Sequence, residues 1–202
     1  MVKLKYQVKG RIEMTTANKL TLLRVLMIPV MILFMYIQSL QKPIGFFNMS
    51  IAQFVIASLF VLASFTDFLD GYIARKYQQI TTFGKFLDPI ADKVLVMVAL
   101  LYLMLMMPLR VPLWAVMIVI IREFMVTGVR LLAIEKGTVL AASIYGKIKT
   151  ATTMFALIVL LFNDFGLSMW IGDILFYVAI FFTLMSGIDY LYKNRNIILE
   201  SI

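Results

Sequence analysis

The chain has 202 residues, of which 62% are hydrophobic and 15% are charged, and its formal net charge is +8. This composition differs strongly from that of soluble globular proteins, so we expect an integral membrane protein folded as one helical bundle. The absence of cysteine excludes a disulfide framework, and the absence of histidine leaves a carboxylate, a lysine or a tyrosine as the general base of any catalysis. Without a soluble basic domain, the positive charge favours anionic lipid headgroups over nucleic acid.

Residues 1–13 differ from the rest of the chain because they are polar and basic, and Met14 follows them directly. This segment is either the remnant of an artificial extension or an arm at the membrane interface. The domain itself is expected to span 14–202. Its first apolar run is too long for the core of a signal peptide and lacks a small-x-small cleavage pattern, so we expect the run to be retained.

Hydropathy predicts an all-α fold with six membrane-spanning helices. Their expected ranges are 20–40, 51–74, 86–107, 111–133, 149–164 and 170–191. Basic residues concentrate in the N-terminal segment, in the second and fourth connections and at the C-terminus, whereas Lys42 and Arg110 are the only bases in the other connections. The positive-inside rule therefore places both termini in the cytoplasm.

Four carboxylates follow helical spacing at one predicted connection. Asp67 and Asp70 end the second helix and Asp88 and Asp92 begin the third, so each pair occupies one helix face. A charge within a bilayer costs about 2.5–3.5 kcal/mol on insertion scales, so such residues usually mark function. Four acids without an equal number of neighbouring bases predict a bound cation, most simply a divalent metal held by oxygen ligands. Two magnesium-type ions would suit such a cavity, where they commonly clamp phosphoryl groups.

Small and basic residues accompany these carboxylates. Gly71 and Ala74 lie on the same side of the second helix and leave room for a flat or bulky ligand, and Gly84 allows a close approach. Arg75 can bind a phosphate through two parallel hydrogen bonds. Each residue alone is typical of a packing contact or a helix end, but together they favour a site for a nucleotide diphosphate.

The string from Asp67 to Asp92 follows the pattern D-x2-D-G-x2-A-R-x8-G-x3-D-x3-D, and in this it resembles the CDP-alcohol phosphatidyltransferase family. The resemblance implies six membrane helices around a site for two divalent metals, Mg²⁺ or Mn²⁺, and a homodimer, although no residue identifies an interface. The implied metal ligands are Asp67, Asp70, Asp88 and Asp92, and Asp92 is also the implied general base. The implied lining of the CDP pocket is Asp70, Gly71, Ala74, Arg75, Gly84 and Asp88.

Four basic residues, here called the basic cluster, lie near the cytoplasmic half of the predicted bundle: Arg122, Arg130, Lys147 and Lys149. The two arginines are eight residues apart and hence near one face of the fourth helix, and Arg122 is too deep in an apolar run to face lipid. Such a cluster suits an acceptor that carries a phosphate rather than a neutral one. The alternative is ordinary positive-inside anchoring, and Glu123 could simply pair with a neighbouring base.

The chain also resembles the bacterial members of this family whose acceptor is sn-glycerol 3-phosphate. The resemblance rests on four strings: Asn18-x-x-Thr21-x-x-Arg24, Arg122-Glu123-Phe124-x-x-Thr127-Gly128-x-Arg130, Gly146-Lys147-x-Lys149-Thr150 and Ser186-Gly187-Ile188-Asp189-Tyr190. It implies phosphate recognition by Arg122, Thr127, Arg130, Lys147 and Lys149. It implies a place at the rim of the donor site for Asn18, Thr21 and Arg24.

These resemblances lead us to expect a multi-pass enzyme of the bacterial cell membrane that transfers phosphatidyl from CDP-diacylglycerol to sn-glycerol 3-phosphate. A sibling enzyme with another phosphorylated acceptor, such as inositol phosphate, would share the basic cluster. A magnesium transporter would also place acids in the membrane, but it would not need Arg75 and should carry acids along its whole path. A regulatory membrane scaffold with a decayed metal site is the third alternative.

Overall fold

The computed structural model describes residues 16–44, 47–76, 82–138, 140–141 and 143–199, and the expected N-terminal arm at 1–13 lies outside these ranges. The fold is all-helical apart from one two-residue strand pair, which confirms the predicted class. The helices are α1 (Thr16–Tyr36), α2 (Ile51–Lys76), α3 (Thr82–Met106), α4 (Leu113–Glu135), α5 (Ile144–Leu161), α6 (Trp170–Lys193) and α7 (Arg195–Leu199). Short 3-10 turns cover Gln38–Leu40 and Asn163–Gly166, and the antiparallel strands are β1 (Pro43–Ile44) and β2 (Met49–Ser50).

Within the described ranges, four segments are long and apolar enough to cross a membrane: Asn18–Tyr36, Phe86–Met106, Ile144–Leu161 and Trp170–Lys193. A shorter apolar segment, Ile51–Asp67, forms most of α2. Large apolar side chains such as Leu33, Leu105 and Phe155 are exposed on the outside of the bundle. Exposed apolar surface on this scale would be unfavourable in water but is expected in lipid, so the protein is a membrane protein.

The helix boundaries agree with the hydropathy ranges to within two or three residues, except for both ends of α1 and the starts of α3 and α5. The first helix begins and ends about one turn earlier than expected, because a 3-10 turn takes over at Gln38. The fifth begins at Ile144 rather than at 149, because the Ser143 hydroxyl accepts a hydrogen bond from the Gly146 amide at 3.1 Å and caps the helix. Hydropathy locates the apolar run, whereas the cap determines where the helix begins.

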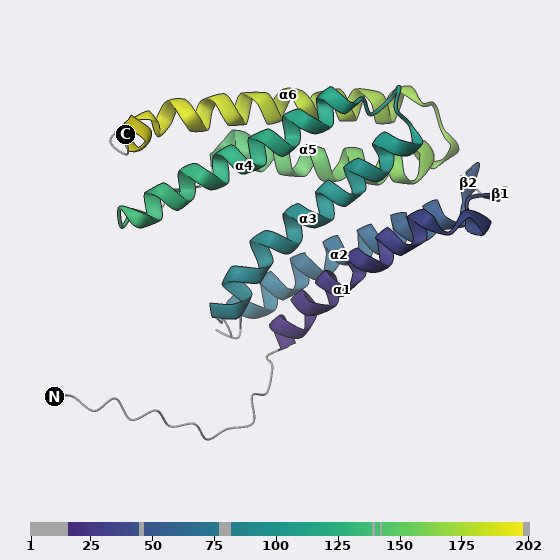
Figure 1. The fold of residues 1–202 in the computed structure, drawn as a ribbon, viewed down its shortest axis with the longest axis horizontal. Helices are drawn as coiled ribbons and strands as arrows, with labels where there is room; N and C mark the ends of the chain where they lie inside the picture. Colours follow the sequence, from purple (N-terminus) through teal and green to yellow (C-terminus); the bar gives the residue numbers. More distant parts are fainter. Residues whose placement is uncertain (1–15, 45–46, 77–81, 139, 142, 200–202) are drawn as a thin grey trace, which may run out of the picture.

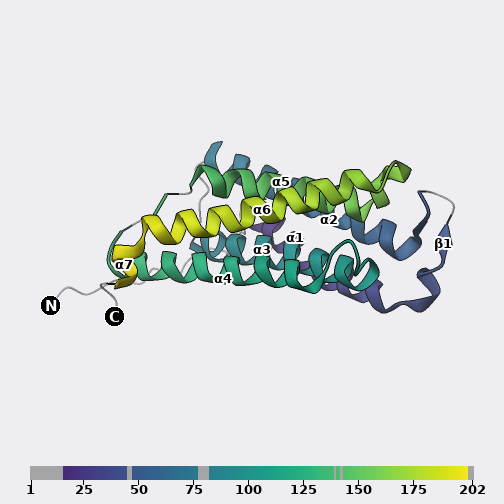
Figure 2. The ribbon, with the colours of Figure 1, turned by 90° about the horizontal axis from the view of Figure 1, so that it is seen from above.

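The third helix lies at the centre of the arrangement. It runs obliquely between the α1–α2 pair and the layer of α4, α5 and α6 (Figure 1), and it contacts α1, α2, α4 and α5. Seen from above, α6 lies between α4 and α5 and packs on both (Figure 2). The side chains of α3 are therefore available to both halves of the bundle.

The apolar core follows from this arrangement. Its main part is formed where α2, α3, α5 and α6 meet, around fully buried residues such as Phe60, Leu103 and Leu157. A smaller cluster of Val126, Val129 and Tyr190 joins α4 to the last turns of α6. This second cluster fixes the end of the bundle at which the basic residues of α4 lie.

An ion-pair network ties the helices together at the opposite end. Arg110, in the turn between α3 and α4, donates to Asp164 Oδ2 at 2.6 Å, to Asp173 Oδ1 at 2.5 Å and to the Met169 carbonyl at 2.7 Å. Burial alone would lower the pKa of Arg110, but its hydrogen bonds to Asp164 and Asp173 outweigh this effect and raise the pKa above its usual value. A Cβ on Gly172 would lie only 2.4 Å from Asp164 Oδ1, so the network also requires a glycine at the start of α6.

We predict that Arg110→Met strongly destabilises the fold, because it leaves the fully buried Asp164 carboxylate without its cation. Removing one partner of a buried ion pair typically costs about 3–5 kcal/mol. Thermal unfolding of the detergent-solubilised protein should show this as a clear fall in melting temperature. The exposed Lys42, mutated to Met, serves as the control. Equal melting temperatures for the two variants would contradict the assigned role.

Candidate active site

Three of the four predicted metal ligands have described side chains, and α1 contacts all three. Arg24 Nη1 donates to Asp67 Oδ1 at 2.8 Å and to Asp92 Oδ1 at 2.7 Å. The Thr21 hydroxyl donates to Asp88 Oδ1 at 2.8 Å. Thr21 and Arg24, which were expected at the rim of the donor site, are both buried against these carboxylates.

Arg24 is completely buried, whereas the side chains of Asp67 and Asp92 are 44% and 47% exposed. The carboxylates thus keep open surface while one cation holds them together from behind. Arg24 lies on α1, far from the acids along the chain, so a count of the bases near the acids in the sequence does not include it. Because a membrane interior gives buried charges little solvation, the arginine and the acids stabilise each other.

The remaining residues of the pattern lie on the same two helices. Asn18 is buried in α1, Gly84 is buried at the start of α3, and Gly71 is half-buried in α2. The side chains of Asp70, Ala74 and Arg75 lie outside the described part of the structure. Their predicted roles at the metal and the nucleotide remain predictions.

The donor set is suited to a hard divalent cation. Asp67 and Asp92 come from different helices, yet one oxygen of each lies within 2.8 Å of the same Arg24 nitrogen, so the two carboxylates converge. All donors are carboxylate oxygens, which Mg²⁺ and Mn²⁺ prefer. Among the described side chains no group of three acidic, histidine or cysteine residues is close enough to hold a metal ion. A complete ligand set would therefore need Asp70 as well.

A cavity of about 700 Å³ joins the acids to the basic cluster. Asp88 and Asp92 of α3 line one wall. The whole basic cluster lines the others: Arg122, Arg130, Lys147 and Lys149. Residues of α3, α4, α5 and α6 thus meet around one space.

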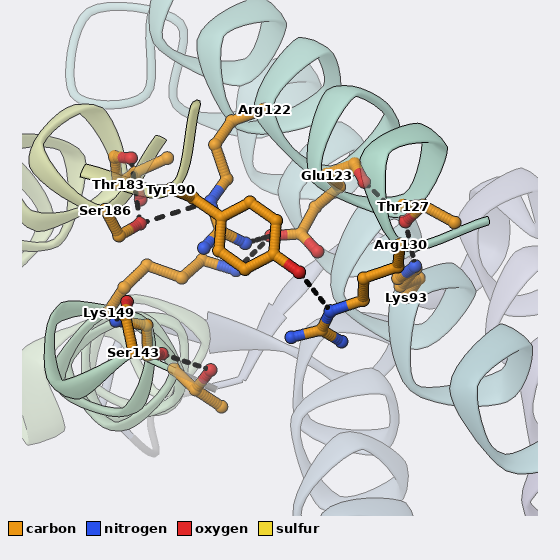
Figure 3. Close-up of polar contacts among 12 residues, drawn as sticks. Lys93, Arg122, Glu123, Thr127, Arg130, Ser143, Lys149, Thr183, Ser186 and Tyr190 are labelled. Carbon is orange, nitrogen blue, oxygen red and sulfur yellow. Dashed lines mark hydrogen bonds and ion pairs between the residues drawn. The ribbon is translucent and has the colours of Figure 1, made fainter. Parts of the chain in front are cut away.

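Two members of the basic cluster share one ion-pair partner, Glu123. Arg122 Nη1 donates to Glu123 Oε1 at 2.9 Å, and Lys149 Nζ donates to the same oxygen (Figure 3). Arg122 Nε donates to the Ser186 hydroxyl of α6 at 3.1 Å. The prediction that Glu123 could pair with a neighbouring base is confirmed, and the carboxylate lies between helices α4 and α5.

Arg130 and Lys147 are the more open members. Arg130 Nε donates to the Tyr190 hydroxyl at 3.2 Å, and its guanidinium carbon lies 5.7 Å from the centre of the Tyr190 ring. Within the described residues neither Arg130 nor Lys147 forms an ion pair, and both side chains are exposed. Because the hydrogen bond uses Nε, both Nη atoms of Arg130 are left for an anion in the cavity.

Several residues of this site were given no role by sequence reasoning: Lys93, Ser143, Ser186 and Tyr190. Lys93 Nζ donates to the Thr127 hydroxyl, and Thr127 in turn donates to the Glu123 carbonyl at 2.6 Å. Ser186 and Tyr190 belong to one of the strings that carried the resemblance, and together with Thr183 they form a buried polar face of α6 at helical spacing. A polar stripe in so apolar a helix is the signal that could have revealed them.

Comparison with known proteins agrees with this geometry. Residues 14–185 match the family model described as CDP-alcohol phosphatidyltransferase. The chain belongs to the CDP-alcohol phosphatidyltransferase family. Members of this family generally depend on a divalent metal, which agrees with the oxygen donors contributed by α2 and α3.

Curated bacterial relatives share most of their length with this family member. A Bacillus subtilis protein is 41% identical over 88% of this chain and 93% of its own length. A Rickettsia prowazekii protein is 41% identical over 89% of this chain and 95% of its own length, and a Haemophilus influenzae protein is 35% identical over 91% and 95%. All three relatives are named CDP-diacylglycerol–glycerol-3-phosphate 3-phosphatidyltransferase.

We predict that Glu123→Gln lowers the stability of the protein, because Arg122 and Lys149 then face each other without a carboxylate. The expected loss is about 3–5 kcal/mol in the free energy of unfolding. It should appear as a fall in melting temperature in detergent. The matched control is Glu135→Gln at the exposed end of α4. If both variants melt alike, Glu123 does not hold the cluster together.

Proposed function

We propose that the protein transfers the phosphatidyl group from CDP-diacylglycerol to sn-glycerol 3-phosphate and releases CMP. The observation that carries this proposal is the single cavity that brings the α3 aspartates of the family pattern to the basic cluster. A donor with a pyrophosphate needs the aspartates and the metals they would hold, and an acceptor with a phosphate needs the basic cluster. The names of the relatives agree with this pair of substrates.

The proposed topology has six membrane-spanning helices and both termini in the cytoplasm. It is supported by the concentration of bases near the cavity end of the bundle and by the near-absence of bases at the Arg110 end. In this arrangement residues 14–202 form one catalytic domain, and the segment 1–13 is an artificial remnant or an interfacial arm. Assembly as a homodimer is proposed from the family resemblance alone.

The donor would bind at the acid side of the cavity. Asp67, Asp70, Asp88 and Asp92 would hold two Mg²⁺ or Mn²⁺ ions, which when bound would supply the positive charge that neutralises the pyrophosphate. The nucleotide end would be bound by the remaining residues of the pattern and by the polar residues of α1: Gly71, Ala74, Arg75, Gly84, Asn18 and Thr21. Arg24 would act from behind the site by holding Asp67 and Asp92 in place.

The acceptor would bind at the basic side. Arg130 and Lys147 would hold the phosphate of glycerol 3-phosphate, because they are the exposed members of the cluster and form no ion pair with the described residues. Arg122 and Lys149, already bound to Glu123, would form the floor of this subsite. Tyr190 would orient Arg130 through its hydroxyl.

The reaction would take place within the cavity, between the donor at the acid side and the acceptor at the basic side. Asp92 would take the proton of the glycerol 1-hydroxyl, and the resulting oxygen would attack the β-phosphorus of CDP-diacylglycerol. The bond between that phosphorus and the CMP oxygen breaks, and CMP leaves with the electron pair. Anchoring of the acceptor by a phosphate that does not react would orient its hydroxyl for this attack.

The experiment that tests the proposal is an assay of CMP release by the purified protein with CDP-diacylglycerol and a choice of acceptors. Glycerol 3-phosphate should support turnover, and glycerol and serine should be poor acceptors because they cannot use the basic cluster. An assay in which inositol phosphate competes with glycerol 3-phosphate distinguishes this activity from that of a sibling enzyme whose acceptor is inositol phosphate. Preference for inositol phosphate, or the absence of CMP release with every acceptor, would overturn the proposal.

We predict that chelation abolishes turnover and that added Mg²⁺ or Mn²⁺ restores it, because Asp67 and Asp92 are half-exposed and, among the described residues, share Arg24 as their cation. The measurement is CMP release with and without excess chelator, followed by titration with each metal. Melting temperature should be recorded alongside, so that unfolding is not mistaken for loss of the metal. Full activity in excess chelator would show that turnover needs no bound metal and would contradict the proposed metal site.

We predict that Arg130→Ala and Lys147→Ala each raise the KM for glycerol 3-phosphate by roughly ten- to a hundredfold, since a charge-assisted hydrogen bond contributes about 1.5–3 kcal/mol. The KM for CDP-diacylglycerol should barely change, because the donor binds at the acid side of the cavity, away from these two bases. Lys136→Ala, an exposed base after the end of α4, is the matched control. If the KM for glycerol 3-phosphate is unchanged in both variants, these bases do not bind the acceptor and serve only as positive-inside anchors.

A further inference from the structure

Lys93 is a charged residue of the cavity that the proposed function does not use. It lies on α3 directly after Asp92, inside the apolar segment Phe86–Met106, and it lines the cavity. A lysine at such a position is costly unless it is paired or reaches water or a ligand. Within the described part of the chain Lys93 forms no ion pair, and its one hydrogen bond goes to the neutral hydroxyl of Thr127. Lys149, by contrast, is paired with Glu123.

The hydroxyl of Thr127 holds this lysine at the basic side of the cavity. Thr127 uses its proton to bond the Glu123 carbonyl at 2.6 Å, which leaves its lone pairs to accept from Lys93 (Figure 3). Arg130 follows Thr127 by three residues and therefore lies on the same face of α4. The ammonium group of Lys93 is thus fixed next to the open arginine of the basic cluster.

The two neighbouring residues of α3 face opposite halves of the bundle. Asp92 bonds to Arg24 of α1, whereas Lys93 bonds to Thr127 of α4. This follows from the helix itself, because successive side chains are separated by about 100° at 3.6 residues per turn. The lysine therefore belongs to the acceptor side, although its neighbour in the sequence belongs to the donor side.

We propose that Lys93 is a third cation for the phosphate of the acceptor, beside Arg130 and Lys147, and that Thr127 is a positioning residue for Lys93. This inference rests on the proposed function and deepens its acceptor subsite. It changes the role expected for Thr127, whose hydroxyl is occupied by two protein partners. A phosphate dianion entering the cavity would give Lys93 the counter-charge that the described residues do not provide.

The main test is Lys93→Met, which keeps most of the length of the side chain and removes its charge. The KM for glycerol 3-phosphate should rise roughly tenfold or more, and the KM for CDP-diacylglycerol should stay the same. Competitive inhibition by inorganic phosphate against glycerol 3-phosphate should weaken by a similar factor. Lys93→Arg should restore most of the acceptor affinity, because it restores the charge.

Thr127→Val tests the positioning role, because it replaces the hydroxyl by a methyl group of similar size. It should raise the KM for glycerol 3-phosphate by a smaller factor, and it should have no further effect in the Lys93→Met background. Thr152→Val is the matched control, since the Thr152 hydroxyl bonds only to backbone carbonyls of its own helix. Full additivity of the two substitutions would overturn the role of Thr127.

A second readout does not require turnover. Inorganic phosphate should raise the melting temperature of the unmutated protein, and this protection should be weaker in Lys93→Met. If the unmutated protein releases no CMP but shows this difference, the proposed function fails and the phosphate site of Lys93 stands. An unchanged KM and unchanged protection, or a rise confined to the KM for CDP-diacylglycerol, would overturn the proposal for Lys93.

Discussion

The Arg24 guanidinium, fully buried between helices, carries the charge on which the acid side of the site depends. One of its nitrogens bonds both Asp67 of α2 and Asp92 of α3, so three helices share one ion-pair centre. An isolated charge could not remain at that depth, and the acids could not lie so close together without it. The positions of the carboxylates therefore depend on the packing of α1 onto α2 and α3, because α1 carries Arg24.

The third helix contributes to both kinds of chemistry in one cavity. Its aspartates bond to α1 at the acid side, while Lys93 bonds to α4 at the basic side. On that second side Glu123 holds Arg122 and Lys149, and α6 contributes the hydroxyls of Ser186 and Tyr190. Under the proposed function, a substrate phosphate would meet cations whose positions are already fixed by neutral hydroxyls and by one carboxylate, which would reduce the entropy lost on binding.

Much of this could be predicted from the sequence, because some signals are local along the chain. Apolar runs revealed the six long helices, and the spacing of Asp67, Asp88 and Asp92 placed acids on helix faces near one end. The partner of those acids could not be found in this way, because Arg24 is more than a whole helix away in the sequence. The same holds for Lys93 with Thr127 and for Arg130 with Tyr190, since only the packing of the helices decides which polar residues meet. Hydropathy likewise missed the strand pair and the early start of α5, which depend on turns and on the Ser143 cap.

The ion pairs of Arg110 hold α6 at one end of the bundle. They fasten α6 at Asp173, near the start of that helix, whereas Tyr190 stands near the end of the helix at the cavity. At 1.5 Å per residue, the distance along the helix between these two residues is about 25 Å. A helix behaves as a stiff rod, so a tilt of about 5° around the fastened end would move the Tyr190 hydroxyl by about 2 Å. A small rotation about the fastened end would therefore be enough to widen or narrow the space around Tyr190.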